Sequence, residues 1–175
     1  MKYLSAITCW IISMFVVPVA TGQPLQTTIK IQAMDMANAL VKNDFPGFSK
    51  YLPPSIVDYG GGAEKMKSNM DSANQAMKQF GVAFKKILIG NPGDIIHYQD
   101  QLQCVVPQTT TMKTPLGELE VTTSLIAISR DRGKSWYFVD TNVYKADKLK
   151  TVLPGLSPDL KIPPQSKPKF TPDQQ

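Results

Sequence analysis

Apolar residues in the first half of the chain recur at the spacing of a helix face. Residues 27–43 carry a broad apolar face with polar side chains opposite, which predicts one helix, and a short second helix is predicted from Pro46 to Leu52. From Ala63 to Phe80 the apolar positions advance by four and three residues, and Gly81 supplies a natural end to this third helix. The stripe consists of Met66, Met70, Ala73, Met77 and Phe80.

This methionine stripe has two interpretations. A single apolar stripe on a helix usually belongs to a core, so the stripe is expected to pack against a sheet. Methionine side chains are also flexible and polarizable, so a row of them can form an adaptable binding surface. The core interpretation is the favoured one.

The pattern changes after Gly81, where β-branched and aromatic residues alternate with polar ones over short segments. Breaks at residues 91–94, 114–117 and 129–133 separate the predicted strands, and a last short helix is predicted from Asn142 to Leu153. Helices followed by strands predict an α+β fold, with the N-terminal helices packed on an antiparallel β-sheet in a single domain. Because two of the strands are long, the sheet is expected to be strongly curved.

An apolar run from Ile7 to Ala20 follows the single positive charge of Lys2. Small residues, Ala20 and Gly22, precede a cut before Gln23, so residues 1–22 are predicted to be a cleaved signal peptide. The run is short for a membrane span, which makes a retained anchor the less favoured alternative. The mature protein is therefore expected to be periplasmic or secreted, with no membrane span.

Residues 23–153 are expected to form the α+β domain, because this length supports a core of its own. Residues 154–175 contain six prolines, which predicts an extended C-terminal tail laid along the domain by Leu160, Ile162 and Phe170. Cys104 is the only cysteine beyond residue 22, so no intramolecular disulfide is expected. Its place in an apolar strand predicts a buried structural thiol.

Charge and residue types exclude several classes of function. The formal net charge of the whole chain is +5, or +4 without Lys2, and the basic residues are scattered, so nucleic-acid binding is not expected. His97 is the only histidine, which excludes a His-rich metal site, and no glycine motif for phosphate or dinucleotide binding occurs. We therefore expect no metal and no cofactor.

The segment SRDRGKSW, residues 129–136, fits the Asp-box pattern Ser-x-Asp-x-Gly-x-Ser/Thr-Trp that is familiar from the blades of sialidases. A propeller needs several blades, whereas the motif occurs here once and follows helices. Its position between two predicted strands indicates a structural hairpin turn instead of glycosidase chemistry. Asp131 is expected to accept backbone hydrogen bonds, Ser129 to bond across the turn, Gly133 to adopt a positive φ and Trp136 to cover the turn.

The order of three segments resembles that of the nuclear transport factor 2-like superfamily. These segments are the helix ANALVKNDFPGFSKYL, the Gly-Gly break after it and the hairpin SLIAISRDRGKSWYFVD. This superfamily is also grouped with cystatin-like folds. The similarity extends from Thr27 to Val143, and the residues that match its early helix are Ala37, Ala39, Asp44 and Phe45. The resemblance implies a cone-shaped fold, and the chain looks most like exported bacterial members of the superfamily.

The favoured function is that of an exported, non-catalytic binding or interaction module. Superfamily enzymes line the cone with Asp/Tyr, His/Asp or Asp/Arg/Asp sets, and none of these sets maps onto this sequence. The module would take a small apolar ligand or a protein partner, and two copies are expected to pair as a homodimer through the outer sheet face. The candidate ligand-binding residues are Tyr59, Met70, Met77, Cys104 and Tyr137.

The alternative is a small cavity enzyme of the isomerase, dehydratase or hydrolase type that acts on an apolar small molecule. His97 and Asp100 are its candidate bases, and Tyr98, Tyr59 or Tyr137 would donate to a developing oxyanion. The competing interpretation is a solvent-facing His97, since a lone histidine has no partner of known geometry. A cavity with buried carboxylates of shifted pKa would favour the enzyme, and a filled interior would favour the module.

Overall fold

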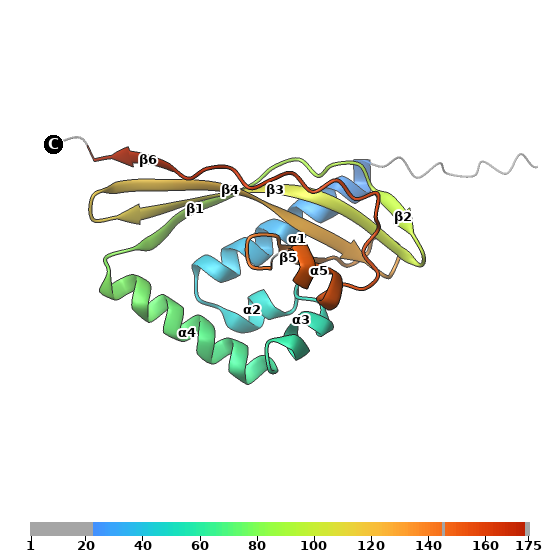
Figure 1. Cartoon of the computed structure of the whole chain (residues 1–175), viewed down its shortest axis with the longest axis horizontal. Helices are drawn as coiled ribbons and strands as arrows, with labels where there is room; N and C mark the ends of the chain where they lie inside the picture. Colours follow the sequence, from blue (N-terminus) through green and yellow to red (C-terminus); the bar gives the residue numbers. More distant parts are fainter. Residues whose placement is uncertain (1–22, 145, 174–175) are drawn as a thin grey trace, which may run out of the picture.

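The computed structural model describes residues 23–144 and 146–173 (Figure 1), so the predicted signal peptide lies outside the described residues. Within these ranges, no helix is long and apolar enough to cross a membrane. The elements in chain order are α1 (Gln23–Val41), α2 (Phe45–Ser49), α3 (Pro54–Tyr59), α4 (Ala63–Gln79), β1 (Ala83–Ile89), β2 (Ile96–Tyr98), β3 (Gln101–Thr114), β4 (Gly117–Ser129), β5 (Tyr137–Asp140), α5 (Ala146–Val152) and β6 (Lys169–Pro172).

The strands form one six-stranded antiparallel sheet with the order β1-β3-β4-β5, in which β2 also pairs with β3 and β6 with β4. Helices pack with this sheet, so the predicted α+β class is confirmed. The sheet is neither closed nor strongly curled, so the strong curvature predicted from the long strands is wrong. Bulges bend sheets sharply, and β3 and β4 pair without any register shift along their length.

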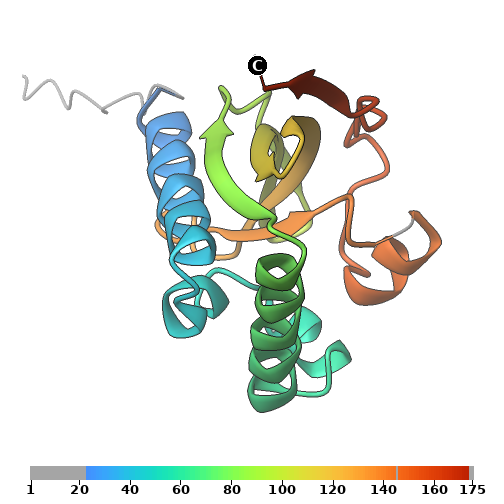
Figure 2. The same ribbon diagram turned by 90° about the vertical axis from the view of Figure 1, so that its left-hand side faces the viewer.

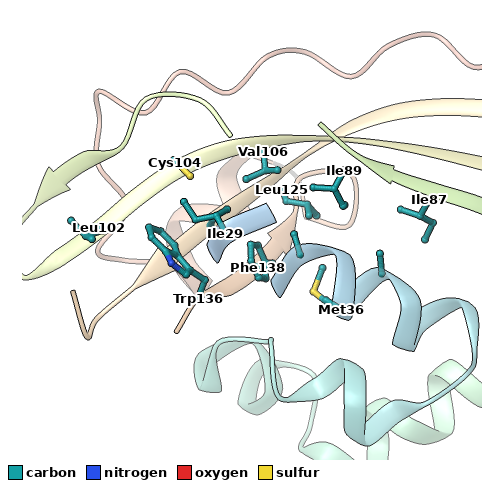
Figure 3. Packing of buried hydrophobic residues seen from close by; sticks show 13 residues of the cluster. Ile29, Met36, Ile87, Ile89, Leu102, Cys104, Val106, Leu125, Trp136 and Phe138 are labelled. Carbon is teal, nitrogen blue, oxygen red and sulfur yellow. The ribbon is translucent and has the colours of Figure 1, made fainter. Parts of the chain in front are cut away.

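The main core lies between α1 and the sheet, as Figure 3 shows. On α1, the buried residues Ile29, Ala33 and Met36 fall on one face because they are spaced four and three residues apart. Inward-pointing side chains of the strands pack against this face, among them Cys104, Val106, Leu125 and Phe138. Burial of these apolar groups holds α1 against the sheet.

The opposite face of the sheet is covered at one end by α5 and the chain that follows it. Ile126, Ile128 and Val139 belong to a second buried cluster with Leu149 and Val152 of α5. The C-terminal half of β4 is therefore buried on both of its faces. This double burial explains why its sequence, LIAI, is a continuous apolar run instead of an alternating one.

α4 does not pack on the sheet, so the favoured interpretation of its methionine stripe as core is wrong. None of its residues is buried: Met66, Met70 and Met77 are half-buried, and Phe80, just after the helix, is 73% exposed. Figure 2 shows α4 below the strands, where it contacts α2 and α3. The physical reason is that α1 already covers this face of the sheet.

The loop at residues 129–136 joins β4 to β5 and is held by its own hydrogen bonds. Asp131 accepts from the backbone N–H of Lys134 at 3.1 Å and of Ser135 at 3.0 Å, and also from the Ser135 hydroxyl. The Ser129 hydroxyl accepts from the N–H of Gly133 at 2.8 Å and donates to Asp131 at 2.8 Å. The pKa of Asp131 is lowered to about 2, first by the Ser135 hydroxyl and then by the other donors.

Gly133 and Trp136 connect this loop to α1. Gly133 has a φ of +86°, and a Cβ at this position would lie 2.3 Å from a methyl group of Leu25. Trp136 is 1% exposed, its ring N–H donates to the Gly133 carbonyl at 3.1 Å, and its backbone N–H donates to Oε1 of Gln32 at 2.8 Å. The Asp-box-like segment thus anchors the start of β5 to α1.

The Pro-rich tail adds a strand to the sheet, which goes beyond the extended conformation predicted for it. β6 pairs with residues 117–120 of β4. Gly117 has a φ of +148°, and a Cβ there would lie 2.2 Å from the Thr171 carbonyl oxygen, so glycine permits this close approach. Leu160 is buried, whereas Phe170 is 48% exposed, so Phe170 does not hold the tail as predicted.

A buried glutamine of β3 fixes the start of the tail. Gln103 is 0% exposed, and its Nε2 donates to the Gly155 carbonyl at 2.6 Å and to Oε1 of Gln101 at 3.1 Å. Its Oε1 accepts from the backbone N–H of Ser157 at 2.9 Å. Gln103 therefore satisfies polar backbone groups that would otherwise be buried without partners.

Candidate ligand-binding site

A cavity of about 430 Å³ lies between the sheet and helices α1 to α4. This volume falls within the range of roughly 300–1,000 Å³ that is typical of small-molecule sites. Most of its wall is apolar and includes Met36, Leu40, Phe45, Phe48, Met66 and Met70. The cavity can therefore surround the apolar body of a small ligand.

α4 forms one wall of this cavity with the stripe that was expected to be core. Met66, Met70 and Ala73 line the cavity. Thioether side chains adapt their rotamers to irregular shapes at little cost, so this wall can fit ligands of different outline. The stripe has the position that the binding-surface interpretation requires.

Three polar side chains meet at the sheet side of the cavity, where Asp140 ends β5. The Gln108 amide and the Thr123 hydroxyl donate to Oδ2 of Asp140, at 3.0 Å and 3.3 Å. The backbone N–H of Asn142 donates to Oδ1 at 2.8 Å. Asp140 and Gln108 line the cavity, and the three hydrogen bonds fix the orientation of the carboxylate.

Sheet register explains why these polar groups lie together. Gln108 is paired with Thr123, and Asp140 is paired with Leu125, two residues further along β4. Residues two apart on a strand share a face, so all three polar side chains lie on the face that carries Leu125 and the main core. The site is therefore a polar continuation of the core at the edge of the cavity.

Burial raises the pKa of Asp140, because its carboxylate loses hydration beside a mostly apolar wall. The hydrogen bonds from Asn142, Thr123 and Gln108 oppose this effect by stabilising the charged form, but they do not cancel it. The pKa of Tyr144, which also lines the cavity, is raised by burial and by the nearby Tyr59. Among the described residues that line the cavity, Asp140 alone carries an acidic carboxyl or a basic group.

The structure brings one predicted ligand-binding residue, Met70, to the cavity wall. Met77 and Tyr137 are half-buried elsewhere. Tyr59 is 53% exposed and packs its ring edge-on against Tyr144 just outside the lining. Cys104 is fully buried in the core beside α1, so four of the five residues do not line the cavity.

The candidate catalytic residues lie away from the cavity. His97 is exposed on β2, Asp100 is exposed in the turn before β3, and Tyr98 is half-buried between them. β2 lies at the end of the sheet opposite to the end where α4 joins β1 (Figure 1). His97 and Asp100 therefore do not supply the cavity with an acid–base pair.

The sequence reasoning missed Asp140 and Gln108, although a signal for both was present. Asp140 stands two residues after the buried Phe138, and Gln108 two residues after the buried Val106. Strict alternation would have extended the inward face of each strand to these polar side chains. A polar residue on a buried face is the pattern that marks a site.

Cys104 is expected to be unreactive in the folded protein. Burial raises its pKa to about 12, so almost no nucleophilic thiolate forms at pH 8, and the surrounding core excludes reagents. In a chain carrying Cys9→Ser, where Cys104 is the only thiol, Ellman's reagent should react at least a hundredfold more slowly before than after unfolding in urea. Equal rates would contradict the buried position.

Neither a scan against models of protein families nor a search of curated proteins finds a match to this chain. In the part of the chain that the structure describes, no group of three or more His, Cys, Asp and Glu side chains is placed to hold a metal ion.

Proposed function

We propose that this protein is an exported, non-catalytic binding module that holds a small, largely apolar molecule between its helices and its sheet. The cavity of about 430 Å³ is the observation that carries this proposal. Its lining combines many apolar side chains with a few convergent polar groups, which is the usual composition of a small-molecule site. The flexible methionines of α4 suit ligands that vary in shape.

The proposal includes membership of the nuclear transport factor 2-like superfamily with its cone-shaped fold. Two observations support this assignment: the N-terminal helices precede an antiparallel sheet in the chain, and a cavity lies between these two layers. The leader-like residues 1–22 support export to the periplasm or the exterior. Pairing of two copies through the outer face of the sheet stays a prediction.

A cavity enzyme is the second candidate, and Asp140 is the observation that favours it. A half-buried carboxyl with a raised pKa beside an apolar cavity can act as a general base. Mass spectrometry of a ligand recovered after incubation separates the two candidates. Recovery of unchanged ligand supports the binding module, whereas conversion that disappears in Asp140→Ala supports the enzyme.

The binding module is tested by filling the cavity from α4. Ala73→Trp places an indole against the cavity, so the affinity for the neutral apolar dye Nile red should fall at least tenfold, as measured by fluorescence titration. Gln75→Trp is the matched control, because this exposed residue of the same helix does not line the cavity. Equal affinities of the two variants would contradict binding at this site.

A further inference from the structure

Asp140 brings an acidic group to the cavity, and no described residue in the cavity wall carries a positive charge that balances it. Asp140 is bonded to three neutral donors, namely the Gln108 amide, the Thr123 hydroxyl and the Asn142 N–H. No lysine or arginine is among the described residues that line the cavity. Asp140 is half-buried, and removing a carboxylate from water in part is a cost that proteins usually offset with an opposite charge.

The hydrogen bonds also leave part of the carboxylate free. An ionised carboxylate offers about four acceptor positions, two on each oxygen. Oδ2 accepts from Gln108 and Thr123, whereas among the described residues Oδ1 accepts only from Asn142. One acceptor position therefore remains on Oδ1, in a side chain that lines the cavity.

We infer that the ligand is an amphipathic amine, with an aliphatic or aromatic body against the methionine wall and a protonated amino group that donates to Oδ1 of Asp140. This inference rests on the proposed function, because it names the ligand class of the same cavity. Burial with no balancing cation keeps the pKa of Asp140 raised, and a bound ammonium group would supply the missing charge. The ring of Tyr144, also in the lining, offers a second favourable contact for a cation.

Other head groups suit this site less well. A carboxylate or phosphate on the ligand would be repelled by Asp140, and the described lining holds no cationic side chain to receive it. A hydroxyl group could donate to Oδ1, but it carries no positive charge and so leaves the charge of the carboxylate without a counterion. The amine is the head group that satisfies both the free acceptor position and the charge.

Three ligands with the same ten-carbon body test the inference: decylamine, decanol and decanoate, each below its micellar concentration at pH 7. The protein expressed from the full chain is loaded with Nile red, and the concentration of each ligand that displaces half of the dye is measured. We expect decylamine to act at about tenfold to a hundredfold lower concentration than decanol, because both head groups can donate a hydrogen bond to Asp140 but only the ammonium adds the attraction between opposite charges. Decanoate should be the weakest of the three.

Two variants assign the preference to Asp140. Asp140→Asn should reduce the difference between decylamine and decanol to less than about threefold, with the affinity for decanol retained. Asp58→Asn, which removes the same charge from an exposed residue of α3, should leave the difference unchanged. The three ligands on the unmodified protein test the inference even if Asp140→Asn does not fold.

The outcomes separate this inference from the proposed function. If Nile red binds but decanol or decanoate displaces it as well as decylamine does, the amine assignment is wrong and the binding module stands. If neither Nile red nor decylamine binds, both fail. A decylamine preference that persists in Asp140→Asn would also overturn the inference.

Discussion

Replacing Trp136 with alanine is expected to lower the free energy of unfolding by about 3–5 kcal/mol, the usual cost of removing a large buried aromatic side chain. Trp136 is 1% exposed and packs with Ile29 and Phe138 in the main core. Its ring N–H also donates to the Gly133 carbonyl, so the variant loses this hydrogen bond together with the packing, whereas the backbone N–H that donates to Gln32 is kept. Urea denaturation followed by circular dichroism measures this effect.

Two further variants separate the contributions of Trp136. Trp136→Phe keeps much of the bulk but loses the ring N–H, so it should lower the free energy of unfolding by a smaller amount, about 1–3 kcal/mol. Tyr137 is the half-buried neighbour of Trp136, and Tyr137→Ala should lower the free energy of unfolding by less than Trp136→Ala does. If Trp136→Ala and Tyr137→Ala were equally stable, Trp136 would not anchor the loop.

Gln103→Ala is expected to lower the free energy of unfolding by about 2–4 kcal/mol, because buried groups left without hydrogen bonds carry a full desolvation penalty. The Ser157 N–H and the Gly155 carbonyl lose their partners in this variant. The chain after α5 should then separate from the sheet more often. Trypsin should cleave faster after Lys161 and Lys169, neither of which is followed by proline, than in the unmodified protein.

The control for Gln103 is another glutamine without a structural contact in the core. Gln75 is exposed on α4, so Gln75→Ala should change stability by less than about 0.5 kcal/mol. Faster cleavage in Gln103→Ala with an unchanged free energy of unfolding would still show that Gln103 holds the start of the tail against the sheet. Unchanged cleavage and unchanged stability together would contradict the anchoring role.

Features set by local contacts could be predicted from the sequence. The hairpin at Asp131 depends on hydrogen bonds between residues at most four positions apart. The local sequence is therefore enough to predict the conformation of the turn. The helix periods and the change to alternation after Gly81 likewise predicted the α+β order. Fold class follows from such periodicity because it reflects which faces are buried.

Features set by tertiary contacts could not be predicted in the same way. The stripe of α4 has the same spacing whether it meets a sheet or a cavity, and only the position of α1 decides between the two. Asp140 acquires its surroundings from β3 and β4, which are distant in sequence. A related reason applies to His97, because its residue type is associated with catalysis but does not indicate which end of the sheet the residue occupies.

The pairing of β6 with β4 has a consequence for how the protein behaves in a crowded solution. An uncovered strand edge offers its N–H and carbonyl groups to other chains and so promotes aggregation. β6 covers part of the β4 edge, and the new outer border carries Lys169 and Pro172, two residue types that discourage further strand addition. β6 therefore shields residues 117–120 of β4 from pairing with a strand of a neighbouring molecule.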